Sequence, residues 1–196
     1  LARLATGRGG PGARLAFYVL VGTIPIVIVG FFAKEFVETS LRSAEVIAWA
    51  TLGFGIVLWI ADRTGMTVRK IEHMTWANAL FIGIMQILAL IPGTSRSGIT
   101  MTAARLLGME RPEAARFSML LSIPTILAAG TLSGYDLYRS GDIALGQDVL
   151  IAAILAFVTA IVAIWGLMLW LRNASFAPFV LYRFALAAGL LYWVYA

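Results

Sequence analysis

The stretch Ile91-Pro92-Gly93-Thr94-Ser95-Arg96-Ser97-Gly98-Ile99-Thr100 is a polar, helix-breaking decapeptide in an otherwise apolar chain. Of the 196 residues, 61% are apolar and only 13% are charged, and the mean hydropathy is +0.90. A soluble domain has about 45–50% apolar residues. The separate apolar runs fit membrane-spanning helices and lack the alternation of barrel strands. We therefore predict an all-α polytopic membrane protein with a single membrane domain over residues 1–196.

The apolar segments on either side of the decapeptide are too short to cross a bilayer. Residues 76–91 form a run that Pro92-Gly93 ends. A helix of this length rises about 24 Å, whereas the hydrocarbon core is about 30 Å thick. A second short helix is predicted over residues 99–107, ended by a left-handed cap at Gly108. Residues 76–108 are therefore interpreted as a re-entrant helical hairpin.

The other apolar runs are long enough to cross the membrane. The five predicted crossings are residues 15–33, 44–61, 110–133, 149–171 and 178–196, and the predicted loops include a basic loop over 1–14, a mixed-charge loop over 34–42 and a polar loop over 136–148. Because the first residue is Leu1 and no signal peptide precedes the first run, an N-terminal part of the fold is expected to be missing.

The positions of Lys and Arg favour the hairpin. If residues 76–108 enter and leave on one side, ten of these side chains lie on that side and three lie opposite. If the segment crosses fully, the split is seven to six. Cytoplasmic loops are enriched in Lys and Arg, so the hairpin is predicted to enter from the cytoplasm. Topology also explains the net charge of +5, and no nucleic-acid partner is expected.

The decapeptide has the composition of an anion site. In the predicted topology Arg96 lies inside the membrane, where an unpaired charge costs at least about 2.5–3.5 kcal/mol. The free N–H groups and the positive dipole end of the second short helix point the same way as this guanidinium. Neighbouring hydroxyls donate hydrogen bonds, and the glycines let a ligand approach the backbone. This combination favours phosphate or carboxylate.

Other polar residues have less specific interpretations. The decapeptide could instead be a water-exposed turn, although the charge tally disfavours this. Gln86 fits either the anion site or a hydrogen bond between two helices. Arg183 is predicted to extend to the membrane interface. His73 is the only histidine, cysteine is absent, and the ten carboxylates fall in loops or near helix ends, so no metal site is expected in this chain.

The sequence resembles the bacterial undecaprenyl-diphosphate phosphatases, also called bacitracin-resistance proteins. The resemblance rests on Pro92-Gly93-Thr94-Ser95-Arg96-Ser97-Gly98 with Thr100 and the upstream Gln86, and extends through Phe117-Ser118, Pro124 and Tyr182-Arg183-Phe184. It implies an inverted-repeat fold with two re-entrant hairpins. The implied site residues are Arg96, Ser95, Ser97 and Thr100 as catalytic residues and Gly93, Thr94, Gly98 and Gln86 as substrate-binding residues.

The implied enzyme is a multi-pass protein of the bacterial inner membrane. It hydrolyses undecaprenyl diphosphate to undecaprenyl phosphate and inorganic phosphate, which recycles the lipid carrier for peptidoglycan synthesis and gives bacitracin resistance. The implied partners are a polyprenyl diphosphate and membrane lipids, and a homodimer is left open. The alternative from another functional class is a lipid-phosphate transporter or flippase that uses the hairpin tip as its anion site.

One family motif is absent from these 196 residues. It has the form Glu-Gly-x-Thr-Glu-Phe-Leu-Pro-x-Ser-Ser-x-Gly-His and supplies the carboxylates and histidine of the other hairpin. A divalent cation, magnesium or calcium, is therefore expected to bind mainly to that missing motif. The 196 residues alone are expected to be inactive.

Overall fold

The computed structural model describes residues 10–140 and 143–196, which are almost entirely helical. The elements are α2 (Pro11–Ser40), α3 (Ala44–Thr64), η1 (Ile71–His73), α4 (Trp76–Gln86), η2 (Ile87–Leu90), α5 (Arg96–Leu106), α6 (Arg111–Ser140), α7 (Ile143–Leu171) and α8 (Ala177–Tyr195). Five helices are long and apolar enough to span a membrane, namely α2, α3, α6, α7 and α8. The predicted all-α polytopic fold is confirmed.

Several helices extend beyond the predicted crossings. α2 already begins at Pro11, because proline is favoured at the first helical position, so residues 11–14 are not part of a loop. It continues to Ser40 through the predicted loop 34–42, where lysine and glutamate are good helix formers. α6 and α7 likewise take up most of the predicted loop 136–148. The predicted loop residues 1–9 and 141–142 lie outside the described part.

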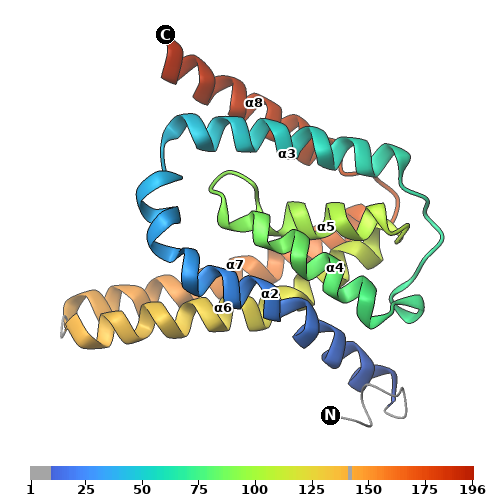
Figure 1. Ribbon diagram of the computed structural model, residues 1–196, viewed down its shortest axis with the longest axis horizontal. Coiled ribbons are helices and arrows are strands. Elements are labelled where there is room, and N and C mark those ends of the chain that lie inside the picture. The colour runs from blue at the N-terminus through green and yellow to red at the C-terminus, as the bar shows by residue number, and fades with distance from the viewer. Residues whose placement is uncertain (1–9, 141–142) are drawn as a thin grey trace.

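The two arms of the hairpin are α4 with η2, and α5 (Figure 1). At its open end, the backbone N–H groups of Val68 and Arg69 donate to the Gly108 oxygen at 3.2 and 3.0 Å. Glu110 N donates back to the Arg69 oxygen at 2.9 Å. Because the chain entering the hairpin pairs with the chain leaving it, both ends lie on the same side. This is the geometry that a re-entrant hairpin requires.

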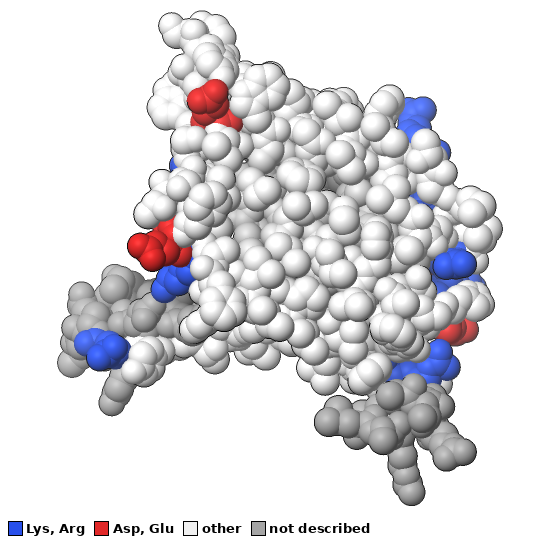
Figure 2. All heavy atoms as spheres, in the orientation of Figure 1, with Lys and Arg blue, Asp and Glu red and all other residues white. Residues whose placement is uncertain are grey.

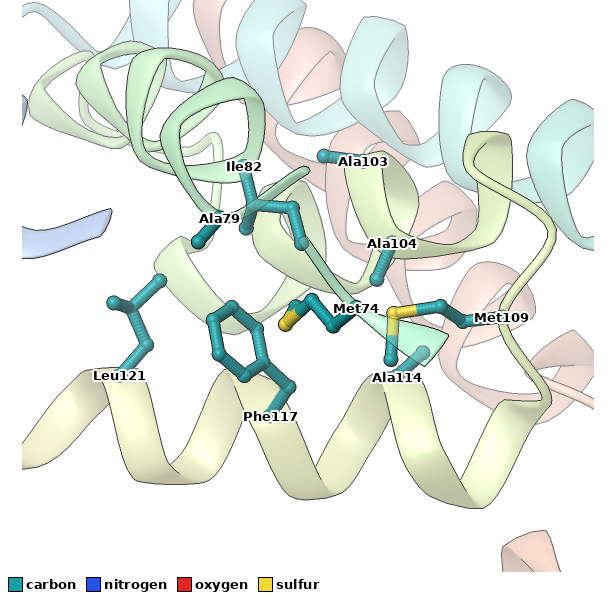
Figure 3. Close-up of a cluster of buried hydrophobic side chains, with 9 residues drawn as sticks. All are labelled: Met74, Ala79, Ile82, Ala103, Ala104, Met109, Ala114, Phe117 and Leu121. Atoms are coloured by element: carbon teal, nitrogen blue, oxygen red, sulfur yellow. The ribbon is translucent and has the colours of Figure 1, made fainter. Parts of the chain in front are cut away.

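The hairpin lies in the centre of the molecule, with α3 on one side and α2 and α6 on the other (Figure 1). Apolar side chains of both arms pack on α6. Figure 3 shows this cluster, which consists of Met74, Ala79, Ile82, Ala103, Ala104, Met109, Ala114, Phe117 and Leu121. Four of the nine are alanines, so the helices approach closely while the larger side chains of α6 fill the remaining space.

The first arm also meets α2 with almost no side chain between the two backbones. A Cβ atom added to Gly83 of α4 would overlap the backbone of Gly22 in α2, and one added to Gly22 would lie 3.1 Å from the Ala79 oxygen. Figure 2 shows a broad uncharged face with Lys, Arg, Asp and Glu gathered at its margins. This distribution fits a protein whose middle lies in hydrocarbon.

Candidate active site

The tip of the hairpin is a turn that ends in an unusual backbone conformation. Thr94 N donates to the Ile91 oxygen at 3.2 Å. Ser95 has a φ of 68°, which lies in the left-handed region that residues other than glycine rarely adopt. Its hydroxyl accepts from Gly98 N at 3.3 Å, so Ser95 caps α5. This cap starts the helix at Arg96, three residues before the predicted start.

An open groove of about 510 Å³ borders the tip. Four of the predicted site residues line it, namely Gly93, Ser95, Ser97 and Gly98. Mostly apolar side chains of α3, α5, α6, α7 and α8 line the rest, together with Thr51 and Arg183. The Ser95 and Ser97 hydroxyl oxygens are 3.5 Å apart. The structure therefore brings two predicted hydroxyls and the first turn of α5 together at one wall of a largely apolar groove.

Arg96 points away from this wall. Its guanidinium is half-buried and Nη1 donates to the backbone oxygen of Ser118 in α6 at 3.3 Å. Within the described ranges, no carboxylate forms an ion pair with Arg96 or with Arg183. Arg96 thus has a neutral partner and keeps a positive charge at the tip.

The remaining predicted residues are buried. The Thr100 hydroxyl lies 2.6 Å from the Ser118 hydroxyl and 3.0 Å from the Arg96 oxygen. Gln86 is fully buried and its Nε2 donates to the Thr125 hydroxyl of α6 at 3.4 Å, which favours the interpretation that it joins two helices. The direct roles predicted for Thr100 and Gln86 at the substrate stay predictions, because both side chains pair with α6 here.

The sequence did not reveal the role of Arg183. It is only 8% exposed and does not extend to the interface as predicted. Nη1 donates to the Thr94 oxygen at 2.8 Å, Nη2 to the Gly93 oxygen at 2.9 Å, and Nε and Nη2 to the Thr51 oxygen at 3.3 and 3.2 Å. Three backbone carbonyls satisfy the guanidinium inside the protein. One sequence signal could have indicated this role: an arginine within a membrane-spanning segment is a candidate functional residue, and this holds for Arg183 as well as for Arg96.

Gly93 packs directly on α3. Its φ is 93°, and an added Cβ would overlap the Ile47 oxygen and lie 2.9 Å from the Thr51 hydroxyl. That hydroxyl also lies 3.3 Å from the Gly93 oxygen. Thr94, the next residue, is fully buried and its hydroxyl has no hydrogen-bond partner among the described residues. The tip is therefore fixed against α3 before it reaches Ser95.

A second buried charge cluster lies at the open end of the hairpin. Asp62 of α3 accepts from Arg111 Nε at 2.6 Å and lies 3.5 Å from Arg105 Nε. Its other oxygen accepts from Phe176 N at 3.3 Å. Arg105 is fully buried and also donates to the backbone oxygens of Asp62 and Gly65 at 3.2 and 2.8 Å. Arg105 therefore joins α5 to α3, and the ion pair between Asp62 and Arg111 joins α3 to α6.

No described residues fit a divalent cation. Over residues 10–140 and 143–196, no group of three or more His, Asp or Glu side chains is arranged to hold a metal ion. The tip offers hydroxyls and two guanidinium groups, and the guanidinium charges repel a cation. Its donor set suits an anion instead.

The sequence is similar to those of one protein family over almost its whole length. The sequence pattern of the family described as "Bacitracin resistance protein BacA" matches residues 3–189. Undecaprenyl-diphosphatase 1 of Rhodospirillum rubrum is 51% identical over 193 residues, which cover 96% of this chain and 67% of the relative. Undecaprenyl-diphosphatases of Alteromonas mediterranea and Roseobacter denitrificans are 48% and 46% identical, with 94% and 99% of this chain and 69% and 73% of the relatives covered. The chain belongs to the bacitracin resistance protein BacA family.

Proposed function

We propose that the protein hydrolyses undecaprenyl diphosphate to undecaprenyl phosphate and inorganic phosphate. This reaction recycles the lipid carrier for peptidoglycan synthesis and gives bacitracin resistance. The observation that carries the proposal is the hairpin tip, where Arg96 keeps its charge without a carboxylate partner next to the first turn of α5 and the hydroxyls of Ser95 and Ser97. These groups are hydrogen-bond donors with a positive charge, and a diphosphate supplies the matching negative charge and acceptor oxygens.

Arg96 can exchange its present partner for a phosphate oxygen. Its hydrogen bond to the Ser118 carbonyl is 3.3 Å long and joins a charged donor to a neutral acceptor. Hydrogen bonds between a guanidinium and phosphate are shorter and about twice as strong as neutral ones, and they form in pairs. Binding of a diphosphate therefore favours rotation of the Arg96 side chain toward the anion. Donors aimed at the phosphate also stabilise the charge that develops during hydrolysis.

The divalent cation that the resemblance implies, magnesium or calcium, does not fit the residues described. We propose that its ligands lie in the part of the relatives that this chain does not match, since the relatives are longer. Such a cation would neutralise negative charge on the diphosphate. What this chain contributes is the arginine, hydroxyl and backbone groups of the tip.

The transporter alternative is not supported. The relatives that match nearly the whole chain are named as diphosphatases. We propose the bacterial inner membrane as the location, because the five long apolar helices require a membrane and the substrate is a membrane lipid. A homodimer is not proposed, because the exposed helix α7 suits lipid as well as a second copy.

The proposal is tested with the gene product that contains these residues, purified in detergent. Phosphate release from undecaprenyl diphosphate is measured with and without magnesium or calcium. Arg96→Ala is expected to lower kcat at least about 100-fold, the usual loss when one preorganised donor is removed from developing charge. Arg42→Ala is the matched control, because Arg42 is exposed and, among the described residues, forms its one ion pair with Glu38 at 3.7 Å. Wild-type turnover by Arg96→Ala would overturn the assignment.

A further inference from the structure

We propose that Arg183 is a positioning residue for the hydrolysis, holding the hairpin tip in the conformation that presents Ser95 and the first turn of α5 to the groove. The inference rests on the proposed function, because it concerns the same site. Arg183 is anchored in α8, outside the hairpin, yet it donates to the two residues that precede Ser95. It acts on the site through the backbone of the tip.

The bond to the Thr94 oxygen controls the orientation of Ser95. That oxygen belongs to the peptide group that joins Thr94 to Ser95, and a peptide group is planar. Holding the oxygen at 2.8 Å from Arg183 Nη1 therefore also fixes the direction of the Ser95 N–H group. Rotation about φ of Ser95 is then restricted, because one side of the bond cannot turn.

Ser95 needs such a restraint. A residue other than glycine with φ near 68° is strained by about 1–3 kcal/mol, and it keeps this conformation only when its surroundings enforce it. Arg183 supplies bonds to three carbonyl oxygens, of Thr51, Gly93 and Thr94, from one planar group. The fork of a guanidinium can join these three points, whereas the single ammonium of a lysine cannot.

Two glycines make room for the guanidinium. An added Cβ on Gly55 of α3 would lie 3.1 Å from the Phe184 ring and 3.5 Å from Arg183 Cβ, so glycine lets α8 approach α3 at this level. An added Cβ on Gly98 would lie 3.1 Å from Arg183 Nη1 and 3.2 Å from the Ser95 hydroxyl. Glycine at position 98 thus leaves room for both the Arg183 guanidinium and the Ser95 hydroxyl that caps α5.

The kinetic arm compares Arg183→Ala and Arg183→Lys with the wild-type gene product in detergent, with rates divided by the folded fraction. Because misplaced groups slow the chemical step, kcat is expected to fall about 10- to 100-fold in Arg183→Ala. KM is expected to change less than about threefold, since the hydrogen bonds that Arg183 donates go to backbone oxygens of Thr51, Gly93 and Thr94. Arg183→Lys keeps the charge and loses the fork, and its kcat is expected to stay close to that of Arg183→Ala. Arg42→Ala is again the control.

The second arm does not depend on activity. Amide hydrogen exchange of residues 91–99 is expected to become faster in both variants, whereas residues 103–109 at the base are expected to exchange as in the wild type. Wild-type kcat in either variant, a loss confined to KM, or unchanged exchange at the tip would each overturn the inference. If the wild type releases no phosphate, the proposed function fails, and the exchange result still decides whether Arg183 holds the tip.

Discussion

Each end of the short helix α5 carries an arginine, and the two arginines have opposite surroundings. Arg105, in the last turn, shares the carboxylate of Asp62 with Arg111 and donates to several backbone oxygens. The guanidinium of Arg96, the first residue, donates to one neutral carbonyl, that of Ser118, among the described residues. A cation is stabilised by the helix dipole at the C-terminal end and destabilised at the N-terminal end. A carboxylate and the helix dipole therefore both stabilise the charge of Arg105 at the base. Within the described residues, Arg96 at the tip has neither.

This difference separates a structural charge cluster from a binding site. At the base, the carboxylate of Asp62 offsets the charge of its neighbours and fixes α3, α5 and α6 relative to one another. At the tip, Arg96 and Arg183 are positively charged and form no ion pair with a described carboxylate, so a bound anion would be favourable there. Substitutions at the base should thus act on stability, and substitutions at the tip should act on turnover.

Asp62→Asn is expected to have the largest effect of the substitutions that test this division. It removes the carboxylate and leaves the charges of Arg105 and Arg111 without a counter-ion in a buried cluster. Breaking a buried pair from one side costs about 3 kcal/mol or more in the free energy of unfolding. The measurement is equilibrium unfolding in mixed micelles, and kcat of the folded fraction is expected to be unchanged.

Glu38→Gln is the matched control for Asp62→Asn. Glu38 pairs with Arg42 at 3.7 Å on the surface, where both side chains are largely exposed. Exposed pairs contribute about 0–1 kcal/mol, so unfolding should hardly change. If Asp62→Asn were as stable as Glu38→Gln, or if it lost turnover without losing stability, the base would not be the structural end of the hairpin.

Gly93→Ala and Gly108→Ala compare the same backbone change at the two ends. Both glycines have positive φ, 93° and 81°, so alanine is strained at either position. At Gly93 the added methyl group would overlap the Ile47 oxygen, whereas at Gly108 its nearest neighbour would be 3.7 Å away. We expect Gly108→Ala to lose about 1–2 kcal/mol of stability from backbone strain, and Gly93→Ala to lose more because of the overlap. Only Gly93→Ala should also lose kcat, by about tenfold, because the tip must move off α3.

Equal turnover in the two glycine variants would remove the distinction between tip and base. The stability loss serves as an internal reference, because it shows that each alanine has been accommodated in a strained conformation. A tenfold loss of kcat in Gly108→Ala would mean that the site depends on the open end of the hairpin as much as on its tip.

Local sequence signals predicted the outline of the hairpin but not the contacts that hold it. Pro92-Gly93 and the short apolar runs indicated its arms, and Gly108 has the left-handed conformation expected of a cap. The predicted start of α5 at residue 99 lies three residues after the observed start at Arg96. The apolar pattern does not register the Ser95 hydroxyl that caps the helix.

The long-range partners of the arginines could not be read from the sequence. Arg183 and Thr94 are 89 residues apart, and Arg105 and Asp62 are 43 apart. Periodicity and hydropathy describe one helix at a time, and they do not show which backbone oxygens a neighbouring helix offers. Only packing determines whether a long cationic side chain extends to the interface or finds carbonyls inside the protein.

Thr51→Val is expected to have the smallest effect, and it tests whether the tip depends on the arginine fork or on the sum of its contacts. Valine keeps the shape of threonine but removes the hydroxyl that lies 3.3 Å from the Gly93 oxygen, while leaving the Thr51 carbonyl and all three acceptors of Arg183 in place. The change also removes the shorter bond from this hydroxyl to the Ile47 oxygen at 2.7 Å, which lies within α3. Loss of one hydrogen bond typically costs about 1 kcal/mol, and the bond that reaches the tip is the longer one, so kcat should stay within about threefold of the wild type. Thr64→Val on the same helix is the control, because that hydroxyl, like that of Thr51, donates to the carbonyl four residues earlier, here Ile60 at 2.8 Å, and forms no hydrogen bond to the tip among the described residues. If Thr51→Val lowered kcat as much as Arg183→Ala, the hydroxyl and not the guanidinium would position the tip.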